Sequence, residues 1–123
     1  MFLSVLVDTY NHERLIEKAL RSALDQDFPR HQFEVIVVDD GSTDKTPEIV
    51  RQFEPRVRLI RKKNGGQASA FNAGIPECRG DVNVFLDGDD WWTQSFPLLT
   101  QFGSEKKCEN VAPHAHSPLN FPP

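Results

Sequence analysis

The 123-residue chain has little cysteine, a deficit of positive charge and no long hydrophobic run. Its two cysteines, Cys78 and Cys108, lie far apart in the sequence, which predicts free thiols in a reducing compartment and no zinc site. No apolar run approaches the ~20 residues of a membrane-spanning helix. The first seven residues are too short, and lack the basic start, for a signal peptide. The net charge of −4 argues against a nucleic-acid partner, which requires a basic face.

Several common nucleotide and nucleophile motifs are also missing. No Gly-x-Gly-x-x-Gly follows the first apolar segment and no Gly-Lys-Ser/Thr loop occurs, which disfavours a nicotinamide enzyme and a P-loop nucleotidase. No Ser, Cys or His lies in a recognisable nucleophile elbow. The length fits one small domain or part of a larger protein.

Strand and helix patterns alternate along residues 1–92. Apolar runs predict strands at residues 2–7, 33–38, 57–60 and 82–86. Between them, helical spacing predicts a helix over residues 12–24 with Asn11 as its cap, a second capped by Thr46, and a third over residues 68–74. Such alternation predicts an α/β fold, with a Rossmann-like, mostly parallel sheet covered by helices on both faces.

The pattern ends after Trp92. Residues 93–123 hold five of the nine prolines and show no periodicity from Gly103 onward. We therefore predict a structured domain over residues 1–92 and an irregular Pro-rich tail over residues 93–123.

Acidic or polar segments follow three of the predicted strands. They read DTYN at residues 8–11, DDGS at 39–42 and DGDD at 87–90. Because the carboxyl ends of parallel strands form one ligand-binding edge, we expect these segments to converge there. Asp87, Asp89 and Asp90 would repel one another unless neutralised, which favours a hard cation such as Mg²⁺ or Mn²⁺. The alternative is a plain surface turn, since Asp and Gly are common turn residues.

The converging segments also offer groups for a nucleotide. Tyr10 can stack on a base, or be a half-buried packing residue. We expect Asp39, which follows a buried strand, to face the cleft and bind base or ribose, although it could simply close a turn. The basic run at residues 61–63 is interpreted as a solvated face more readily than as a phosphate contact. Trp91 and Trp92 fit either an acceptor-site lid or the core.

Four segments together resemble the family 2 glycosyltransferases with the GT-A fold. They are residues 3–11, 33–44, 70–75 and 85–90, in the order and at the spacing of that family, and the resemblance covers residues 2–92. It implies a nucleotide-sugar donor, commonly a UDP-sugar, and a divalent metal, Mg²⁺ or Mn²⁺.

The resemblance also implies roles for particular residues. Asp87-Gly88-Asp89 matches the DXD motif, with Asp89 on the metal and Asp87 near both the metal and the ribose. Tyr10 would lie near the base, and Asn72 would support the site. The full set of donor-binding candidates is Thr9, Tyr10, Asp39, Asp40, Asn72 and Asp87.

Two features depart from the family pattern. Asp8 stands where the family usually has proline, which changes the loop's entry geometry or adds a carboxylate. The acceptor half, with the general base, normally follows the DXD motif, and we identify no base here. We therefore interpret the chain as the truncated, donor-binding part of a glycosyltransferase. The alternatives are a catalytically inactive nucleotide-sugar-binding fragment and, less favoured, a nucleotidyltransferase.

Partners and location follow from the same reasoning. The acceptor, whether saccharide, lipid or protein, is not defined by these residues. The sheet edge left open beside the last predicted strand favours self-association. We expect a cytoplasmic protein, with the inner face of the membrane as an alternative location.

Overall fold

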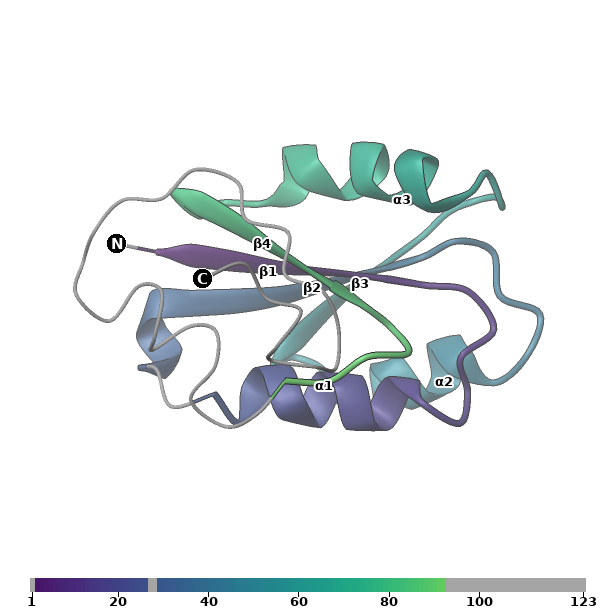
Figure 1. The fold of residues 1–123 in the computed structure, drawn as a ribbon, viewed down its shortest axis with the longest axis horizontal. Coiled ribbons are helices and arrows are strands. Elements are labelled where there is room, and N and C mark those ends of the chain that lie inside the picture. Colours follow the sequence, from purple (N-terminus) through teal and green to yellow (C-terminus); the bar gives the residue numbers. More distant parts are fainter. Residues whose placement is uncertain (1, 27–28, 93–123) are drawn as a thin grey trace.

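The computed structural model describes residues 2–26 and 29–92, and these form a single sheet flanked by helices (Figure 1). In chain order the elements are β1 (Leu3–Thr9), α1 (Ile16–Leu24), the 3₁₀ turn η1 (Arg30–Gln32), β2 (Phe33–Asp39), α2 (Thr46–Arg51), β3 (Val57–Arg61), α3 (Gln67–Gly74), the 3₁₀ turn η2 (Ile75–Glu77) and β4 (Val82–Asp87). The predicted alternation is confirmed. The predicted tail at residues 93–123 lies outside the described residues.

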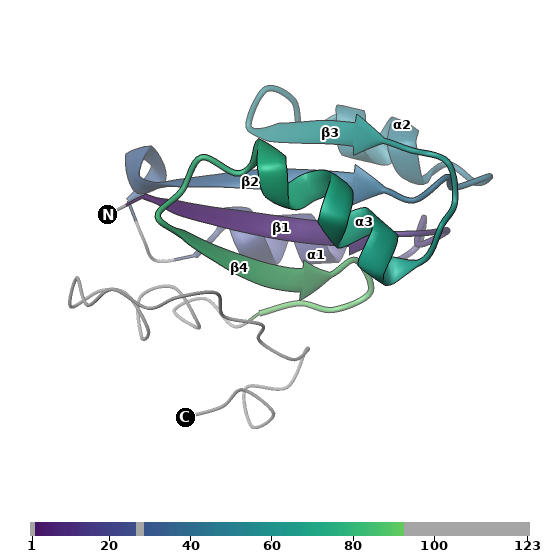
Figure 2. The ribbon, with the colours of Figure 1, turned by 90° about the horizontal axis from the view of Figure 1, so that it is seen from above.

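The sheet has the strand order β3-β2-β1-β4, and every pair is parallel. Figure 2 shows the strands in this order, with α3 on one face and α1 and α2 behind the other. The chain moves outward from β1 to β3 and then returns to the far side of β1. Because parallel crossovers are right-handed, reversing the direction of travel places α3 on the face opposite α1 and α2. The predicted Rossmann-like sheet with two covered faces is therefore confirmed.

Each face of the sheet has its own hydrophobic core. Side chains alternate along a strand, so Val5 and Val7 of β1 pack with α1 and α2, whereas Leu6 packs with Ala70 of α3. All three β1 side chains are fully buried. Burying one such aliphatic side chain contributes about 1.5–3 kcal/mol, which explains why the strands read as nearly continuous apolar runs.

The loop from β1 to α1 differs from the sequence prediction. Helix α1 begins at Ile16 and not at residue 12, and Asn11 has a positive φ of 54°. The Asn11 Oδ1 accepts the Thr43 N–H at 2.8 Å, and the Asn11 N–H donates to Ser42 Oγ at 2.8 Å. The expected cap is wrong because Asn11 instead joins this loop to the loop that follows β2.

The start of α2 also differs in detail. Thr46 is the first residue of the helix, and its N–H donates to Asp44 Oδ1 at 2.9 Å. The Thr46 hydroxyl accepts the His12 N–H at 3.0 Å. The side chain expected to cap α2 thus forms a further link between the two loops, which holds the ends of β1 and β2 together. No helix in the described part of the chain is long and apolar enough to cross a membrane.

Candidate functional site

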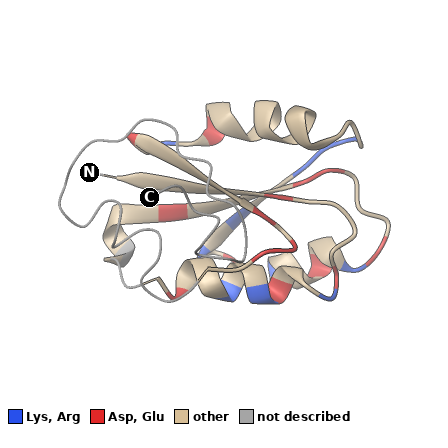
Figure 3. Ribbon diagram, in the orientation of Figure 1, with Lys and Arg blue, Asp and Glu red and all other residues tan. Residues whose placement is uncertain are grey.

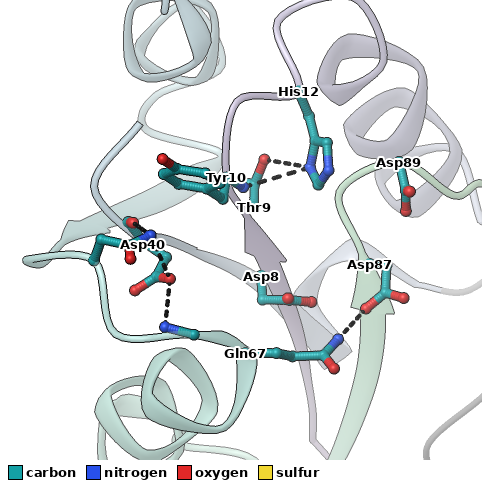
Figure 4. Close-up of a pocket in the computed structure, with 10 residues that line it drawn as sticks. Asp8, Thr9, Tyr10, His12, Asp40, Gln67, Asp87 and Asp89 are labelled. Atoms are coloured by element: carbon teal, nitrogen blue, oxygen red, sulfur yellow. Dashed lines mark hydrogen bonds between the residues drawn. The ribbon is translucent and has the colours of Figure 1, made fainter. Parts of the chain in front are cut away.

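A cleft of about 330 Å³ opens at the carboxyl ends of β1 and β4 (Figure 4). This is where the strand order reverses, and ligands of open α/β sheets bind at such points. Its lining residues are Asp8, Thr9, Tyr10, His12, Asp40, Asn64, Gly66, Gln67, Asp87 and Asp89. Figure 3 shows acidic segments gathered in the loops at this edge of the sheet. The structure thus brings together the three acidic segments as expected, and adds the segment that follows β3.

Asp40 lies at the end of the cleft that also holds Tyr10. Its side chain is buried, and the residue is only 4% exposed. Its carboxylate accepts hydrogen bonds from Lys62 Nζ at 2.9 Å, from the Gly65 and Gly66 N–H groups at 3.0 and 2.8 Å, and from Asn64 Nδ2 at 3.2 Å. Burial alone would raise the pKa of Asp40, but the hydrogen bonds from Lys62, Gly66 and Gly65 and the Lys62 charge hold it below its usual value.

These four bonds occupy the acceptor positions that a carboxylate offers. A donor group of a ligand must therefore displace one of them. The Asn64 bond is the longest of the four and is the natural one to exchange. Tyr10 is 43% exposed beside this carboxylate, so a planar group can reach both side chains.

Asp39 does not line the cleft, contrary to the expectation that it faces it. It is 0% exposed, and its Oδ2 accepts a hydrogen bond from Arg61 Nε at 2.9 Å. The period of two along β2 places Asp39 on the same face as Val35 and Val37, under the loop that follows β2, where Ser42 also bonds to it.

The basic run at residues 61–63 is accordingly not a simple solvated face. Arg61 pairs with Asp39 and Lys62 pairs with Asp40, each at 2.9 Å. Asn72 is exposed on α3 and is not among the lining residues. The lining residues Thr9, Tyr10, Asp40, Asp87 and Asp89 come together, whereas Asp39 and Asn72 stay apart from them.

The opposite end of the cleft is acidic. Asp87, Asp89 and Asp90 each offer a carboxylate oxygen, and these oxygens lie within 4.8 Å of one another. Asp89 is exposed, Asp87 is partly buried and its Oδ1 accepts a hydrogen bond from Gln67 Nε2 at 2.7 Å. Closely spaced oxygen ligands of this type fit a hard divalent cation such as Mg²⁺ or Mn²⁺.

Gly88 explains how the acidic turn lies so near β1. A Cβ on Gly88 would stand 2.7 Å from the Thr9 Cβ and 2.8 Å from His12 Nδ1. Any larger residue would push the turn away from the loop after β1. The glycine of the DGD sequence is therefore needed for close approach, and it keeps the two walls of the cleft together.

Asp8 adds a carboxylate to the floor of the cleft. β1 continues in register with both neighbours through this residue, so replacing the family's proline leaves the strand regular. Burial raises the pKa of Asp8 to about 8, with a further contribution from the adjacent Asp87 carboxylate. Within the described residues its Oδ1 is buried without a hydrogen-bond partner. Of the two effects expected for this departure, the added carboxylate is the one observed.

Three polar side chains that line the cleft were missed by sequence reasoning. His12, Asn64 and Gln67 belong to no motif of metal or nucleotide ligands. The only available signal was their position, in the loop after β1, in the loop after β3 or at the start of α3. Trp92, by contrast, is a core residue that is 4% exposed, and its backbone N–H donates to Ser22 Oγ on α1 at 3.1 Å.

These features define an open α/β protein whose cleft lies at the carboxyl ends of β1 and β4. The sequence profile of the family described as "Glycosyl transferase family 2" matches residues 4–111, and the chain belongs to this family. The match continues past Trp92, further than the resemblance over residues 2–92 indicated.

Curated relatives agree with this assignment. Over 95 residues the chain is 39% identical to the poly(ribitol-phosphate) beta-N-acetylglucosaminyltransferase TarS of Staphylococcus aureus. This alignment covers 74% of this chain and 17% of TarS. It is 35% identical over 113 residues to the uncharacterized glycosyltransferase EpsJ of Bacillus subtilis, covering 89% of this chain and 32% of EpsJ. The chain thus spans about a third or less of these relatives.

Solved structures show the same fold. S. aureus TarS 1-349 in complex with UDP superposes with a TM-score of 0.77 at 33% identity, covering 85% of this chain and 31% of that one. The mannosyltransferase PcManGT from Pyrobaculum calidifontis, in complex with GDP-Man and Mn²⁺, gives a TM-score of 0.69 at 38% identity. The superposition covers 73% of this chain and 28% of PcManGT. The chain therefore has the Rossmann-like GT-A fold.

Proposed function

We propose that the cleft binds a nucleotide-diphosphate sugar, specifically a UDP-sugar, as the donor for transfer to an acceptor hydroxyl. The observation that carries the proposal is that one cleft holds an exposed aromatic ring at one end and an acidic cluster at the other. A nucleotide-diphosphate sugar has matching parts, because its base can stack on an aromatic ring and its diphosphate requires a cation. The UDP and UDP-GlcNAc complexes of TarS support the choice of donor.

The base and ribose are assigned to the end with Tyr10. Tyr10 stacks on the base, Thr9 lies at the end of β1 beside it, and a base N–H replaces Asn64 on the Asp40 carboxylate. The burial of Asp39 supports a different role for this residue, in which its ion pair with Arg61 fixes the wall behind the site. Asn72 remains a candidate that would act from α3 without lining the cleft.

The diphosphate is assigned to the acidic end. Asp89 and Asp87 would hold Mg²⁺ or Mn²⁺ there, and the Mn²⁺ in the PcManGT complex supports the choice. Such a cation neutralises a diphosphate and stabilises it as a leaving group. Gln67 orients Asp87 through its hydrogen bond, and Gly88 keeps both acids against the β1 loop.

Calorimetric titration with UDP tests the donor site. We expect binding in Mn²⁺ that is lost in EDTA and in Asp89→Asn, because the two acids and the diphosphate repel without a cation. Asp25→Asn removes another exposed carboxylate, outside the cleft, and should bind as the wild type does. UDP affinity that is the same in EDTA, or in Asp89→Asn, would contradict the metal assignment.

Turnover is a separate measurement. With a UDP-sugar and a panel of acceptors, a transferase releases UDP. A nucleotidyltransferase instead releases pyrophosphate when it is given UTP and a sugar 1-phosphate. Acceptor-dependent UDP release by this chain would support transfer. UDP binding without release would favour the inactive donor-binding alternative.

A further inference from the structure

His12 lies at the acidic end of the cleft, yet neither the proposed cation site nor the proposed base site gives it a role. It lines the cleft together with Asp87 and Asp89. Figure 4 shows the imidazole between Thr9 and Asp89, on the side away from Asp40. A Cβ at Gly88 would lie 2.8 Å from His12 Nδ1, so the imidazole ring packs directly against the DGD turn.

Two contacts at Nδ1 bear on which ring nitrogen of the neutral imidazole carries the hydrogen. The Tyr10 backbone N–H, which can only donate, points at His12 Nδ1 with an N···N distance of 3.5 Å. Thr9 Oγ1 lies 2.9 Å from the same nitrogen, and a hydroxyl can donate to it. We take Nδ1 as the acceptor of the Tyr10 N–H, and in that tautomer the hydrogen of the neutral imidazole is on Nε2.

This tautomer determines what Nε2 can bind. A metal ligand must present a lone pair, and an Nε2–H does not. Among the described residues, every hydrogen bond found for the imidazole goes to Nδ1. The N–H at Nε2 is therefore suited to an anionic oxygen that arrives with a ligand.

We infer that His12 is a donor-binding residue that gives a hydrogen bond from Nε2–H to a diphosphate oxygen, beside the cation held by Asp87 and Asp89. The inference rests on the proposed function, because only a ligand that reaches the acidic end brings such an oxygen. Thr9 then acts as the positioning residue, since its hydroxyl and the Tyr10 N–H fix the ring's tautomer. The same loop would carry the base contact at Tyr10 and the diphosphate contact at His12.

Two substitutions separate the nitrogens. The amide nitrogen of Gln extends to about the position of Nε2 and retains a donor there, whereas the amide of Asn ends near Nδ1. With Mn²⁺ present, losing a hydrogen bond to a charged group predicts that His12→Asn binds UDP about tenfold or more weakly, and that His12→Gln stays within about threefold of the wild type. His31→Asn, the same change at an exposed histidine on η1, should leave UDP affinity unchanged.

Uridine and Mn²⁺ alone serve as the decisive probes. Uridine lacks the diphosphate, so its affinity in ligand-observed NMR titration should be equal in the wild type, His12→Asn and His12→Gln, and so should the affinity for Mn²⁺ alone. Thermal melting of each variant checks that the fold is retained.

Four results would overturn the inference. They are undiminished UDP affinity in His12→Asn, an equal loss for uridine and UDP, a loss in Mn²⁺ binding alone, or a loss in His12→Gln as large as that in His12→Asn. If the wild type binds no UDP at all, the proposed function itself fails and takes the inference with it. Binding of UDP by the wild type with unchanged binding by His12→Asn refutes only the inference.

Discussion

Replacing Asp40 by asparagine should destabilise the fold, although the residue lies at a ligand cleft. The change keeps the shape of the side chain but removes its charge and turns one acceptor into a donor. That donor would face the backbone N–H groups of Gly65 and Gly66, which now bond to the carboxylate at 3.0 and 2.8 Å. It would also leave the Lys62 ammonium, on a side chain that is 19% exposed, without its ion-pair partner.

The size of the loss can be worked from these contacts. Removing one partner of a fully buried ion pair costs about 3–5 kcal/mol. Lys62 lies near the surface and can turn partly toward water, so we expect about 2–4 kcal/mol for Asp40→Asn. That is a large share of the ~5–15 kcal/mol that stabilises a typical domain.

The pH dependence has a defined sign. The folded pKa of Asp40 lies below its ordinary value of 3.8. Its contribution to stability is therefore present above the unfolded pKa and is lost as pH falls through the folded pKa. Asp40→Asn should lower stability at pH 7 and make it fall less steeply below pH 4 than in the wild type.

Urea unfolding followed by tryptophan fluorescence measures this, because Trp92 is buried against α1. A double-mutant cycle with Lys62→Met isolates the ion pair, and we expect a coupling energy of about 1–2 kcal/mol. Asp25→Asn, at an exposed acid, should change stability by less than about 0.5 kcal/mol. An unchanged urea midpoint for Asp40→Asn, or costs that simply add in the double variant, would refute the reasoning.

Three further predictions concern the surroundings of the cleft. Asp39→Ala should lower the free energy of unfolding by about 2 kcal/mol, because Arg61 loses its fully buried partner, and unchanged urea stability with lost UDP affinity would restore the sequence-based expectation. Burial would raise the pKa of Asp44, but hydrogen bonds, first among them those from Thr46 at the start of α2, outweigh it and lower the pKa below 3.8. Asp44→Asn should therefore destabilise the protein at pH 7, and the destabilisation should become smaller as the pH falls below 3.8, which urea midpoints at pH 7 and pH 3 would check. Gly88→Ala should weaken UDP binding in Mn²⁺ because its Cβ would displace His12, and a calorimetric affinity equal to that of the wild type would contradict the close approach.

The sequence was informative where one local rule decides the outcome. Buried strands of a parallel sheet read as apolar runs, and the acidic segments that follow them must meet at one edge. It was less informative where a side chain has competing partners. Asn11 is a good helix cap in isolation, but the loop beyond β2 offers it two backbone or hydroxyl partners instead. That choice depends on contacts about 30 residues away, which local patterns do not contain.

The pair Asp39 and Asp40 illustrates the same limit within the site. Two adjacent carboxylates look equivalent in sequence, yet the alternation of β2 buries the first and leaves only the second at the cleft. The loop that holds Asp40, with Asn64 and Gly66, carries no motif that links it to residue 40. His12 was missed for a related reason, because its significance comes from the DGD turn that packs against it.

The central position of β1 has a consequence for how the cleft forms. β1 pairs with β2, in which Leu3 faces Phe33, and with β4, in which Leu3 faces Val82. Pairing β1 with β4 therefore closes a much longer stretch of chain than pairing β1 with β2. Parallel pairing over such long sequence separations is intrinsically slow. During synthesis the Tyr10 and Asp40 end can assemble from the first three strands, whereas the acidic end must wait for β4. The cleft is thus completed only when β4 docks, and a ligand that spans both ends would hold that strand in place.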